Sequence, residues 1–213
     1  MVGHDDLVPR LVDPVLAPGS LARLPQPVLV LDEFVLRPWR ASDASAVVEA
    51  YAEPSIQRWH GRSMTEDEAR AWLDSWPGRW AQETGGGWAV AGESGLLGQV
   101  SLRRVSLIEG LTEVSYWVLP AARGHGVAPR ALRAVTSWVF DQLSLHRIDL
   151  AHSTMNLASC RVAAKAGYAL EGTKRREALH ADGWHDMHLH ARLIDDSKLE
   201  VDCDVGRFRP PRS

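Results

Sequence analysis

The sequence predicts an α/β (α+β) fold built on one mixed, mostly antiparallel central sheet. Three β-prone segments at residues 87–92, 96–107 and 111–119 follow one another with short glycine-containing turns between them, which favours an antiparallel meander. A helical segment then separates the third strand from a fourth at residues 146–151. Because a strand–helix–strand crossover places its two strands side by side in the same direction, we expect this pair to be parallel.

The length and composition indicate a single folded domain. The chain has 213 residues, of which 45% are hydrophobic, and this is enough for a sizeable core. We place the domain at residues 28–196, between an N-terminal arm at 1–27 and an irregular C-terminal tail at 197–213. The arm contains five prolines and single apolar residues that follow neither the helical nor the strand period. We expect it to pack on the domain or on a partner subunit, which leaves a homodimer open.

Charge and cysteine usage exclude several classes of partner. The formal net charge of -3 offers no basic surface for nucleic acid, and no apolar run is long enough for a membrane span. The two cysteines, Cys160 and Cys203, lie far apart and give no disulfide framework. The first residues are acidic where a secretory signal is basic. We therefore expect a cytoplasmic protein without nucleic-acid or membrane partners.

The first part of the domain is predicted to contain a strand and then a helix. Val28–Trp39 is typical of a first strand or a hairpin. Ser42 is a good N-cap residue for a helix that continues through Glu53 and ends before Pro54.

A second helix begins at the capping box Thr65 to Glu68. Its apolar residues recur at helical spacing, the last of them only if the helix continues past Pro77: Ala69, Trp72, Leu73, Trp76 and Trp80. Aromatic stripes at this spacing most often pack in a core.

The second half of the domain is organised around a glycine turn at residues 123–126, which follows Pro120 and precedes a helix that begins near Ala128. The apolar residues of that helix are Leu132, Val135, Val139, Phe140 and Leu143. After the strand at 146–151, a short helix at 158–166 is closed by Gly167. A hairpin formed by residues 168–179 and 184–193 completes the domain.

The glycine turn itself predicts an anion site. Gly124 and Gly126 carry no side chain, so the backbone can approach a ligand closely. The helix that follows points unpaired N–H groups and its positive dipole end toward the turn. A diphosphate is the ligand that such a turn favours.

Two common glycine-loop chemistries fit the turn poorly. A P-loop would continue with Gly-Lys-Ser/Thr, but Gly126 is followed by Val127 and Ala128. A dinucleotide-binding fingerprint would place a third glycine where Pro129 stands, and would occupy the first βα unit. Hydrolysis of a nucleoside triphosphate and dinucleotide binding are both disfavoured.

A third chemistry matches more of the chain. The order of motifs resembles the RimJ/RimL-like branch of the GNAT superfamily of N-acetyltransferases, and the resemblance covers about Leu29 to Asp196. The matching residues are Arg123-x-x-Gly126-x-Ala128 after the strand Glu113–Leu119, then Asn156-x-x-Ser159, Gly167-Tyr168 and Glu171-Gly172.

The resemblance implies a GNAT-like sheet whose parallel strand pair splays apart, with helices on both faces and acetyl-CoA as cosubstrate. The splay would leave backbone groups that must find partners, and the amides of pantetheine can supply them. The residues implied to hold the cosubstrate are Trp117, Val118, Leu119, Arg123, Gly124, His125, Gly126, Val127, Ala128, Asn156 and Ser159.

The resemblance also implies a catalytic set for direct transfer of the acetyl group to a primary amine in a ternary complex. Glu113 has the position of the acidic residue that would take the proton of the amine, and Glu177 is the reserve candidate. Ser159 would either protonate the leaving thiolate or merely cap the helix that begins near it. Cys160 in the first turn of that helix raises the alternative of an acyl-enzyme.

The resemblance implies a small-molecule or peptide amine as the acceptor, and in the resembling branch the acceptor ranges from protein N-termini to antibiotics of the aminoglycoside type. The first two helices border the acceptor pocket there, so Trp59, Trp72 and Trp76 are candidates for shaping specificity. A non-catalytic acyl-CoA-binding or regulatory module remains the alternative from another class.

Histidines near the C-terminal hairpin raise the question of a metal. His188 and His190 share one strand face, with His180 and His185 close in sequence. No carboxylate or cysteine spacing completes a known ligand set, so we expect no metal.

Overall fold

The computed structural model describes residues 11–198, and the predicted mixed, mostly antiparallel sheet is confirmed. Its eight strands are arranged in the order β1-β2-β3-β4-β5-β6-β8-β7, and β5 with β6 is the parallel pair in this part of the chain. The strands are β1 (Leu29–Val30), β2 (Phe34–Pro38), β3 (Gly85–Gly92), β4 (Gly95–Ser106), β5 (Leu111–Val118), β6 (Arg147–Ser153), β7 (Ala169–His180) and β8 (Gly183–Leu193).

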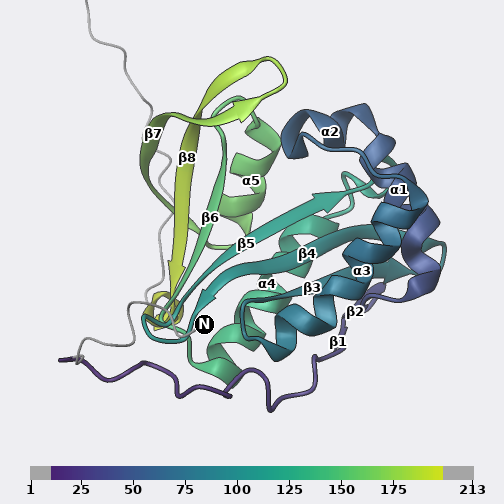
Figure 1. Ribbon diagram of the computed structural model, residues 1–213. Helices are drawn as coiled ribbons and strands as arrows, with labels where there is room; N and C mark the ends of the chain where they lie inside the picture. Colours follow the sequence, from purple (N-terminus) through teal and green to yellow (C-terminus); the bar gives the residue numbers. More distant parts are fainter. Residues whose placement is uncertain (1–10, 199–213) are drawn as a thin grey trace, which may run out of the picture.

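Helices cover both faces of the sheet. Figure 1 shows α3 in front of β3 and β4, and α4 behind them. The α-helices are α1 (Ala44–Ala52), α2 (Pro54–His60), α3 (Glu66–Ala81), α4 (Val127–Trp138) and α5 (Leu157–Lys165). A π-helical turn at Val139–Leu143 continues α4. No helix in residues 11–198 is both long and apolar enough to cross a membrane.

The predicted start of the first helix is wrong. Ser42 lies inside a short 3-10 turn, and α1 begins after Asp43 instead. The buried carboxylate of Asp43 accepts two hydrogen bonds from the Arg37 guanidinium, each 2.8 Å long, and one of 2.9 Å from the backbone N–H of Arg40. This network fixes the Asp43 carboxylate at the N-terminus of α1, where a negative charge is favoured.

Pro54 does more than end α1, because it opens a helix that the sequence pattern does not predict. A proline at the first helical position loses no hydrogen bond and has a suitable φ angle. The Glu53 carboxylate accepts a hydrogen bond of 3.2 Å from the backbone N–H of Ser55 and so caps α2. The helix ends at Gly61, whose φ of 60° is left-handed. The turn after it therefore aims the next residues toward the sheet.

The capping box at Thr65 and Glu68 is confirmed, and α3 continues past Pro77 to Ala81. On its inner face Trp76 packs where β3 has no side chain. A Cβ at Gly87 would lie 2.6 Å from the Trp76 ring. The glycine run of β3 therefore provides the space that the large aromatic residues of α3 fill.

The described part of the arm, residues 11–27, packs on the domain. Leu21 is fully buried, and the carboxylate of Glu83 accepts hydrogen bonds of 2.7 Å from the N–H groups of Gly19 and Leu21. The indole of Trp80 donates to the carbonyl of Leu24 at 2.8 Å. The domain boundaries themselves remain a prediction, and residues 1–10 and 199–213, with most of the expected tail, lie outside the described residues.

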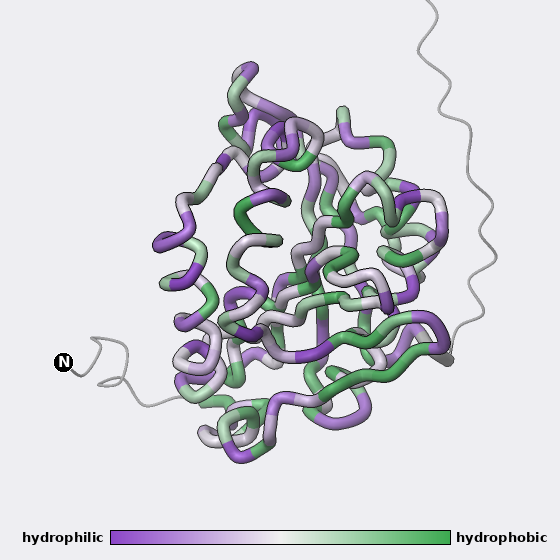
Figure 2. The backbone as a smooth tube through the Cα atoms, turned by 90° about the vertical axis from the view of Figure 1, so that its right-hand side faces the viewer, coloured by the Kyte–Doolittle hydropathy of each residue, from purple (hydrophilic) through white to green (hydrophobic). Residues whose placement is uncertain are grey.

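The apolar interior follows the strands. In Figure 2 the hydrophobic residues gather along the inner strands, and many hydrophilic residues lie at the outer turns. The main core cluster joins α4 and the strands β2 to β6, and a second cluster joins α1, α2 and α3 to Trp117 on β5. The main cluster packs on the N-terminal half of β5, and the second cluster packs on its C-terminal half.

Candidate active site

The parallel pair splays apart, as predicted. β5 and β6 are paired through three positions only, ending at Glu113 opposite Asp149. Beyond that point β5 remains paired with β4, and β6 remains paired with β8. Figure 1 shows the two strands diverging toward α2 and the β7–β8 hairpin.

The backbone of β5 turns particular peptide groups into the opening. The N–H of Leu119 donates to the carbonyl of Leu97 on the β4 side at 2.9 Å. Since hydrogen bonding alternates along an antiparallel strand, Trp117 also faces β4, and Tyr116 and Val118 face the opening. Of the three backbone positions predicted to meet the cosubstrate, Val118 faces the opening, while the amide of Leu119 is already bonded. The Arg123 side chain donates through Nε to the carbonyl of Val118 at 3.0 Å.

The glycine turn adopts the conformation that its residues permit. Gly124 and Gly126 have φ angles of 83° and 73°, and a Cβ at Gly124 would meet no atom within 4 Å. Gly126 is the N-cap of α4 and offers no side-chain acceptor. The first N–H groups of α4 therefore remain available to an anion, with the positive end of the helix dipole behind them.

A cavity of about 670 Å³ occupies the splay. Seven of the predicted site residues line it: Trp59, Trp117, Val118, Arg123, Ala128, Asn156 and Ser159. His125 and Val127 instead line a second, smaller hollow of about 350 Å³.

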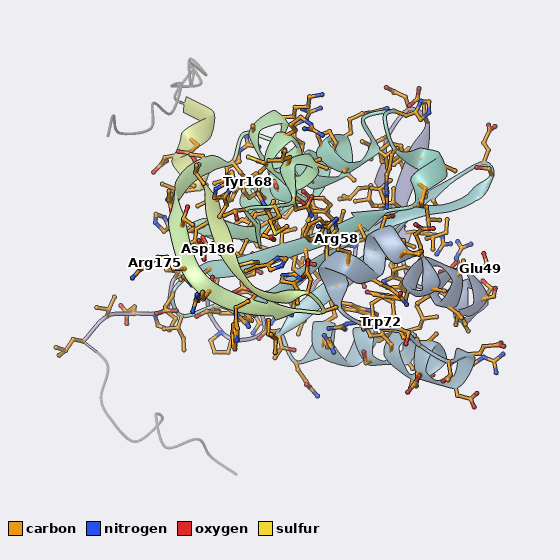
Figure 3. All side chains as sticks on the ribbon, turned by 90° about the horizontal axis from the view of Figure 1, so that it is seen from above. Glu49, Arg58, Trp72, Tyr168, Arg175 and Asp186 are labelled. Carbon is orange, nitrogen blue, oxygen red and sulfur yellow. The ribbon has the colours of Figure 1, made fainter. Side chains whose placement is uncertain are left out.

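Two elements distant in sequence meet at the far end of the cavity. The ring of Trp59 on α2 contacts the ring of His180 on β7, with 6.1 Å between their centroids. The Nδ1 atom of His180 lies 3.2 Å from the carbonyl of Arg58 and donates to it. Figure 3 shows Arg58 where α2 meets the β7–β8 hairpin. We refer to this end of the cavity, lined by Trp59 and His180, as the acceptor end.

The other two tryptophans proposed for this wall lie elsewhere. Trp72 packs edge-on against Trp39 and Trp76, with ring centroids 5.2 Å and 5.4 Å away, and Trp76 is 3% exposed. Neither lines the cavity. Their rings pack against other aromatic side chains of this layer. Of the three tryptophans proposed for the wall, Trp59 alone lines the cavity.

Ser159 and Tyr116 form a hydroxyl pair on the cavity wall. The phenol of Tyr116 donates to Oγ of Ser159 at 3.0 Å. Burial raises the pKa of Tyr116 to about 12, so its hydroxyl keeps its proton at neutral pH. The alternative that Ser159 caps α5 is wrong, because Oδ1 of Asn156 does so by accepting from the N–H of Ser159 at 3.1 Å. The hydroxyl of Ser159 is free to point its own hydrogen into the cavity.

The two predicted acidic residues are not brought to the cavity. Glu113 lies on the paired half of β5 and forms a 2.6 Å ion pair with Arg104. Glu177 forms a 2.6 Å ion pair with Lys174 on β7. In the described residues, no aspartate or glutamate lines the cavity.

Cationic and imidazole groups line the acceptor end instead. Arg62 and Arg103 both line the cavity, and His60 lies close to them. Burial and then the charge of Arg62 lower the pKa of His60 to about 4, so the ring is neutral at pH 7. Sequence reasoning missed this group, since α2 itself was not predicted and nothing in the sequence brings Arg103 to it.

A splayed parallel pair with a free strand edge, beside a glycine turn at a helix N-terminus, is the arrangement that the resemblance to N-acetyltransferases predicts for acyl-CoA binding. The particular family follows from comparison with known proteins. The chain belongs to the acetyltransferase (GNAT) domain family, whose sequence profile matches residues 33–169.

Individual relatives agree with this assignment. The chain is 33% identical over 112 residues to the probable N-acetyltransferase YjcK of Bacillus subtilis, covering 51% of this chain and 61% of that protein. It is 29% identical over 103 residues to the ribosomal-protein-serine acetyltransferase of Escherichia coli, covering 48% and 58%. The chain thus spans about three fifths of these two relatives.

The fold is shared with solved structures. RimL, a ribosomal L7/L12 alpha-N-protein acetyltransferase solved in complex with coenzyme A, superposes with a TM-score of 0.74 at 18% identity. The match covers 80% of this chain and 99% of that one. The chain is therefore a member of the GNAT family that shares its fold with RimL.

Proposed function

We propose that this protein transfers an acetyl group from acetyl-CoA to a primary amine, on a peptide N-terminus or a small molecule, by direct attack within a ternary complex. The observation that carries the proposal is the continuous cavity from Ala128 at the glycine turn to Trp59 at α2. Because its lining includes residues at both places, one substrate can bind near the glycine turn and the other near α2. The printed activity of the Escherichia coli relative, on a ribosomal protein, supports a peptide acceptor.

The residues present fit coenzyme A. The first N–H groups of α4, at Val127 and Ala128, would hold the diphosphate. The outward edge of Val118 would pair with the amides of pantetheine. Asn156, whose Oδ1 is used in the cap of α5, keeps its NH₂ group for the same arm. Acetyl-CoA supplies the thioester, and the protein positions it beside Tyr116 and Ser159.

Removal of the amine proton is assigned to water. No described carboxylate lines the cavity, and the lowered pKa of His60 makes its ring a weak base. An α-amino group with a pKa of about 8 is partly neutral at physiological pH and needs no strong base. His60 would then orient the neutral amine or the water.

The role as base that the sequence suggests for Glu113 can be tested by substitution. Because the Glu113 carboxylate is paired with Arg104 outside the cavity, we expect Glu113→Gln to change kcat by less than about 3-fold between pH 6 and 9. The measurement is the rate of thiol release from acetyl-CoA at each pH. A fall of about 100-fold that is largest at low pH would restore Glu113 as the base.

The lack of a carboxylate in the cavity also favours one alternative, a module that binds acyl-CoA without turnover. Incubating the protein with acetyl-CoA and a panel of peptides, polyamines and aminoglycosides, while following free thiol, separates the two functions. Amine-dependent thiol release supports the transferase. Saturable CoA binding with no release for any amine would favour the binding module.

The acceptor end of the cavity carries two arginine side chains. Arg62 and Arg103 line it, and neither forms an ion pair with another residue in the 11–198 range. Their charges both lower the pKa of His60, so the two guanidinium groups act on the same part of the cavity. We propose that an acidic side chain or carboxylate close to the amine pairs with them.

Substitution of these arginines is expected to raise KM for acidic acceptors and to leave KM for neutral acceptors unchanged. Arg62→Ala and Arg103→Ala should each raise KM for a peptide with aspartate at its second position by about 5-fold, with kcat nearly unchanged, because an exposed ion pair contributes about 1 kcal/mol. KM for the matching asparagine peptide should stay constant. Arg175→Ala is the control, since Figure 3 shows Arg175 on the hairpin away from Arg58 and it does not line the cavity. Equal losses for both peptides would contradict the proposal.

A further inference from the structure

Four potential metal ligands from three elements converge at the cavity wall, and one of them, His152, also lines the cavity. His152 on β6 lies opposite His188 on β8, and Cys160 on α5 completes the group with His190. One ligand atom from each residue lies within 4.8 Å of every other. Sequence spacing could not reveal this set, because its members are separated by up to 38 positions and meet only when α5 packs on the two strands.

The hydrogen bonds of two histidines fix their tautomers. Nδ1 of His152 lies 2.8 Å from the carbonyl of Ser153, and Nδ1 of His190 lies 3.4 Å from the carbonyl of Tyr168. A carbonyl only accepts, so each Nδ1 carries the hydrogen. In a neutral ring the Nε2 atom then presents its lone pair. A histidine held in this way by a backbone carbonyl is the usual arrangement around a bound metal.

The two Nε2 atoms face each other at 3.1 Å. Two lone pairs at this distance repel, and two N–H groups would clash. A single shared proton would leave a buried cation, and no described carboxylate bonds to either ring. A metal ion placed between the Nε2 atoms of His152 and His190 removes the conflict, because it accepts both lone pairs.

The remaining two residues supply what such an ion would need. Nδ1 of His188 is buried and has no hydrogen-bond partner. Cys160 carries a free thiol and does not line the cavity, so its position gives no support to an acyl-enzyme. As a thiolate, Cys160 would provide the negative charge that balances a divalent cation in this partly buried place.

We propose that His152, Cys160, His188 and His190 form a binding site for one divalent transition-metal ion, and that Zn²⁺ fits this ligand set best. Three imidazoles and one thiolate are a tetrahedral zinc donor set, with bonds of about 2.0–2.3 Å. That geometry separates the donor atoms by roughly 3.3–3.6 Å, so the widest pairs close by about 1 Å and the His152–His190 pair opens slightly. On binding, the S–H bond of Cys160 breaks, an S–Zn bond forms, and the proton leaves to solvent.

The site is inferred without reference to the proposed acceptor or to the transfer reaction, and Zn²⁺ binding can be measured without either. Its ion would tie α5 to β6 and β8, next to Ser159, and so would hold one wall of the cavity in place. Binding to the folded protein alone would raise the thermal midpoint in proportion to the logarithm of the free ion concentration.

The test is a metal titration of the full chain, without an affinity tag and stripped by a chelator. Calorimetry with Zn²⁺ is expected to show one ion per chain with a Kd of about 1 µM or lower. Release of about one proton per ion is expected where the free thiol is protonated. Titration with Co²⁺ is expected to give the intense visible bands of a tetrahedral site together with a thiolate-to-cobalt charge-transfer band in the near ultraviolet.

Variants assign the ligands. Cys160→Ser should abolish the charge-transfer band, and both Cys160→Ser and His188→Gln should weaken Zn²⁺ binding by at least about 10-fold. The control is His146→Asn, which removes an exposed histidine outside the cluster and should bind as the wild type does. Circular dichroism and CoA binding check that each variant is folded. If a variant does not fold, the wild-type cobalt spectrum decides alone. Absence of stoichiometric Zn²⁺ uptake, or uptake unchanged in both cluster variants, would overturn the site.

Discussion

Replacing Ala128 by glutamate is expected to weaken acetyl-CoA binding by about 100-fold. Ala128 is the second residue of α4 and lines the cavity beside Arg123. A carboxylate there would compete for the first N–H groups of the helix and repel a diphosphate. A loss of one or two charge-assisted hydrogen bonds corresponds to about 2–3 kcal/mol, which is near 100-fold in Kd. Calorimetry with CoA measures the change directly.

A neutral variant and a shorter donor isolate the cause. Ala128→Gln introduces nearly the same volume without charge, and should cost about 10-fold or less. Acetyl-pantetheine has no diphosphate, so its KM should differ little between the glutamate and glutamine variants. If Ala128→Glu weakened acetyl-pantetheine as much as acetyl-CoA, the glycine turn would not be the diphosphate site. Higher ionic strength should narrow the gap between the two variants.

The sheet and the glycine turn were predictable because their signals are local. Alternating apolar residues and glycine turns specify the meander, and Gly124 and Gly126 specify the left-handed turn that the structure shows. The capping box at Thr65 likewise depends on residues three positions apart. The splay between β5 and β6 came from a family resemblance, since nothing in either strand says where pairing stops.

The features that the sequence did not predict correctly fall into two groups, each with its own physical reason. Pro54 can end one helix or begin the next, and the choice depends on whether Glu53 caps Ser55, which a pattern does not reveal. The other misses are long-range. The direction of the Leu119 amide follows from its register against Leu97 on β4. The pairing of Glu113 with Arg104 depends on an irregularity in β4 between Arg103 and Ser106.

The proposed catalytic pair is a contact between residues 43 positions apart, Tyr116 and Ser159. The sequence suggests Ser159 through a resemblance. It cannot show that Asn156 caps α5, which leaves the Ser159 hydroxyl without a capping role. It gives no reason to select Tyr116 from the other residues of β5. The same limitation applies to the imidazole and thiol cluster, in which each ligand looks ordinary in its own segment.

Ser159→Ala is expected to lower kcat by about 100-fold with little change in KM for acetyl-CoA. Oγ of Ser159 accepts from the Tyr116 phenol, so its own hydrogen is directed into the cavity, where a leaving thiolate would need it. A positioned proton donor contributes about 100-fold or more to the rate. Tyr116→Phe removes the support behind Ser159 and should cost about 10-fold. The rate of thiol release at saturating amine measures both.

The double variant and a neighbouring serine decide whether the two hydroxyls act together. If Tyr116 acts only through Ser159, the double variant Ser159→Ala/Tyr116→Phe should be no slower than Ser159→Ala alone, because groups that act as a unit lose their effect together. Ser115→Ala removes another hydroxyl from the cavity wall and should leave kcat near the wild-type value. Multiplicative losses in the double variant would mean that Tyr116 acts separately on the substrate. An unchanged kcat in Ser159→Ala would remove Ser159 from the mechanism and leave the leaving thiolate to solvent.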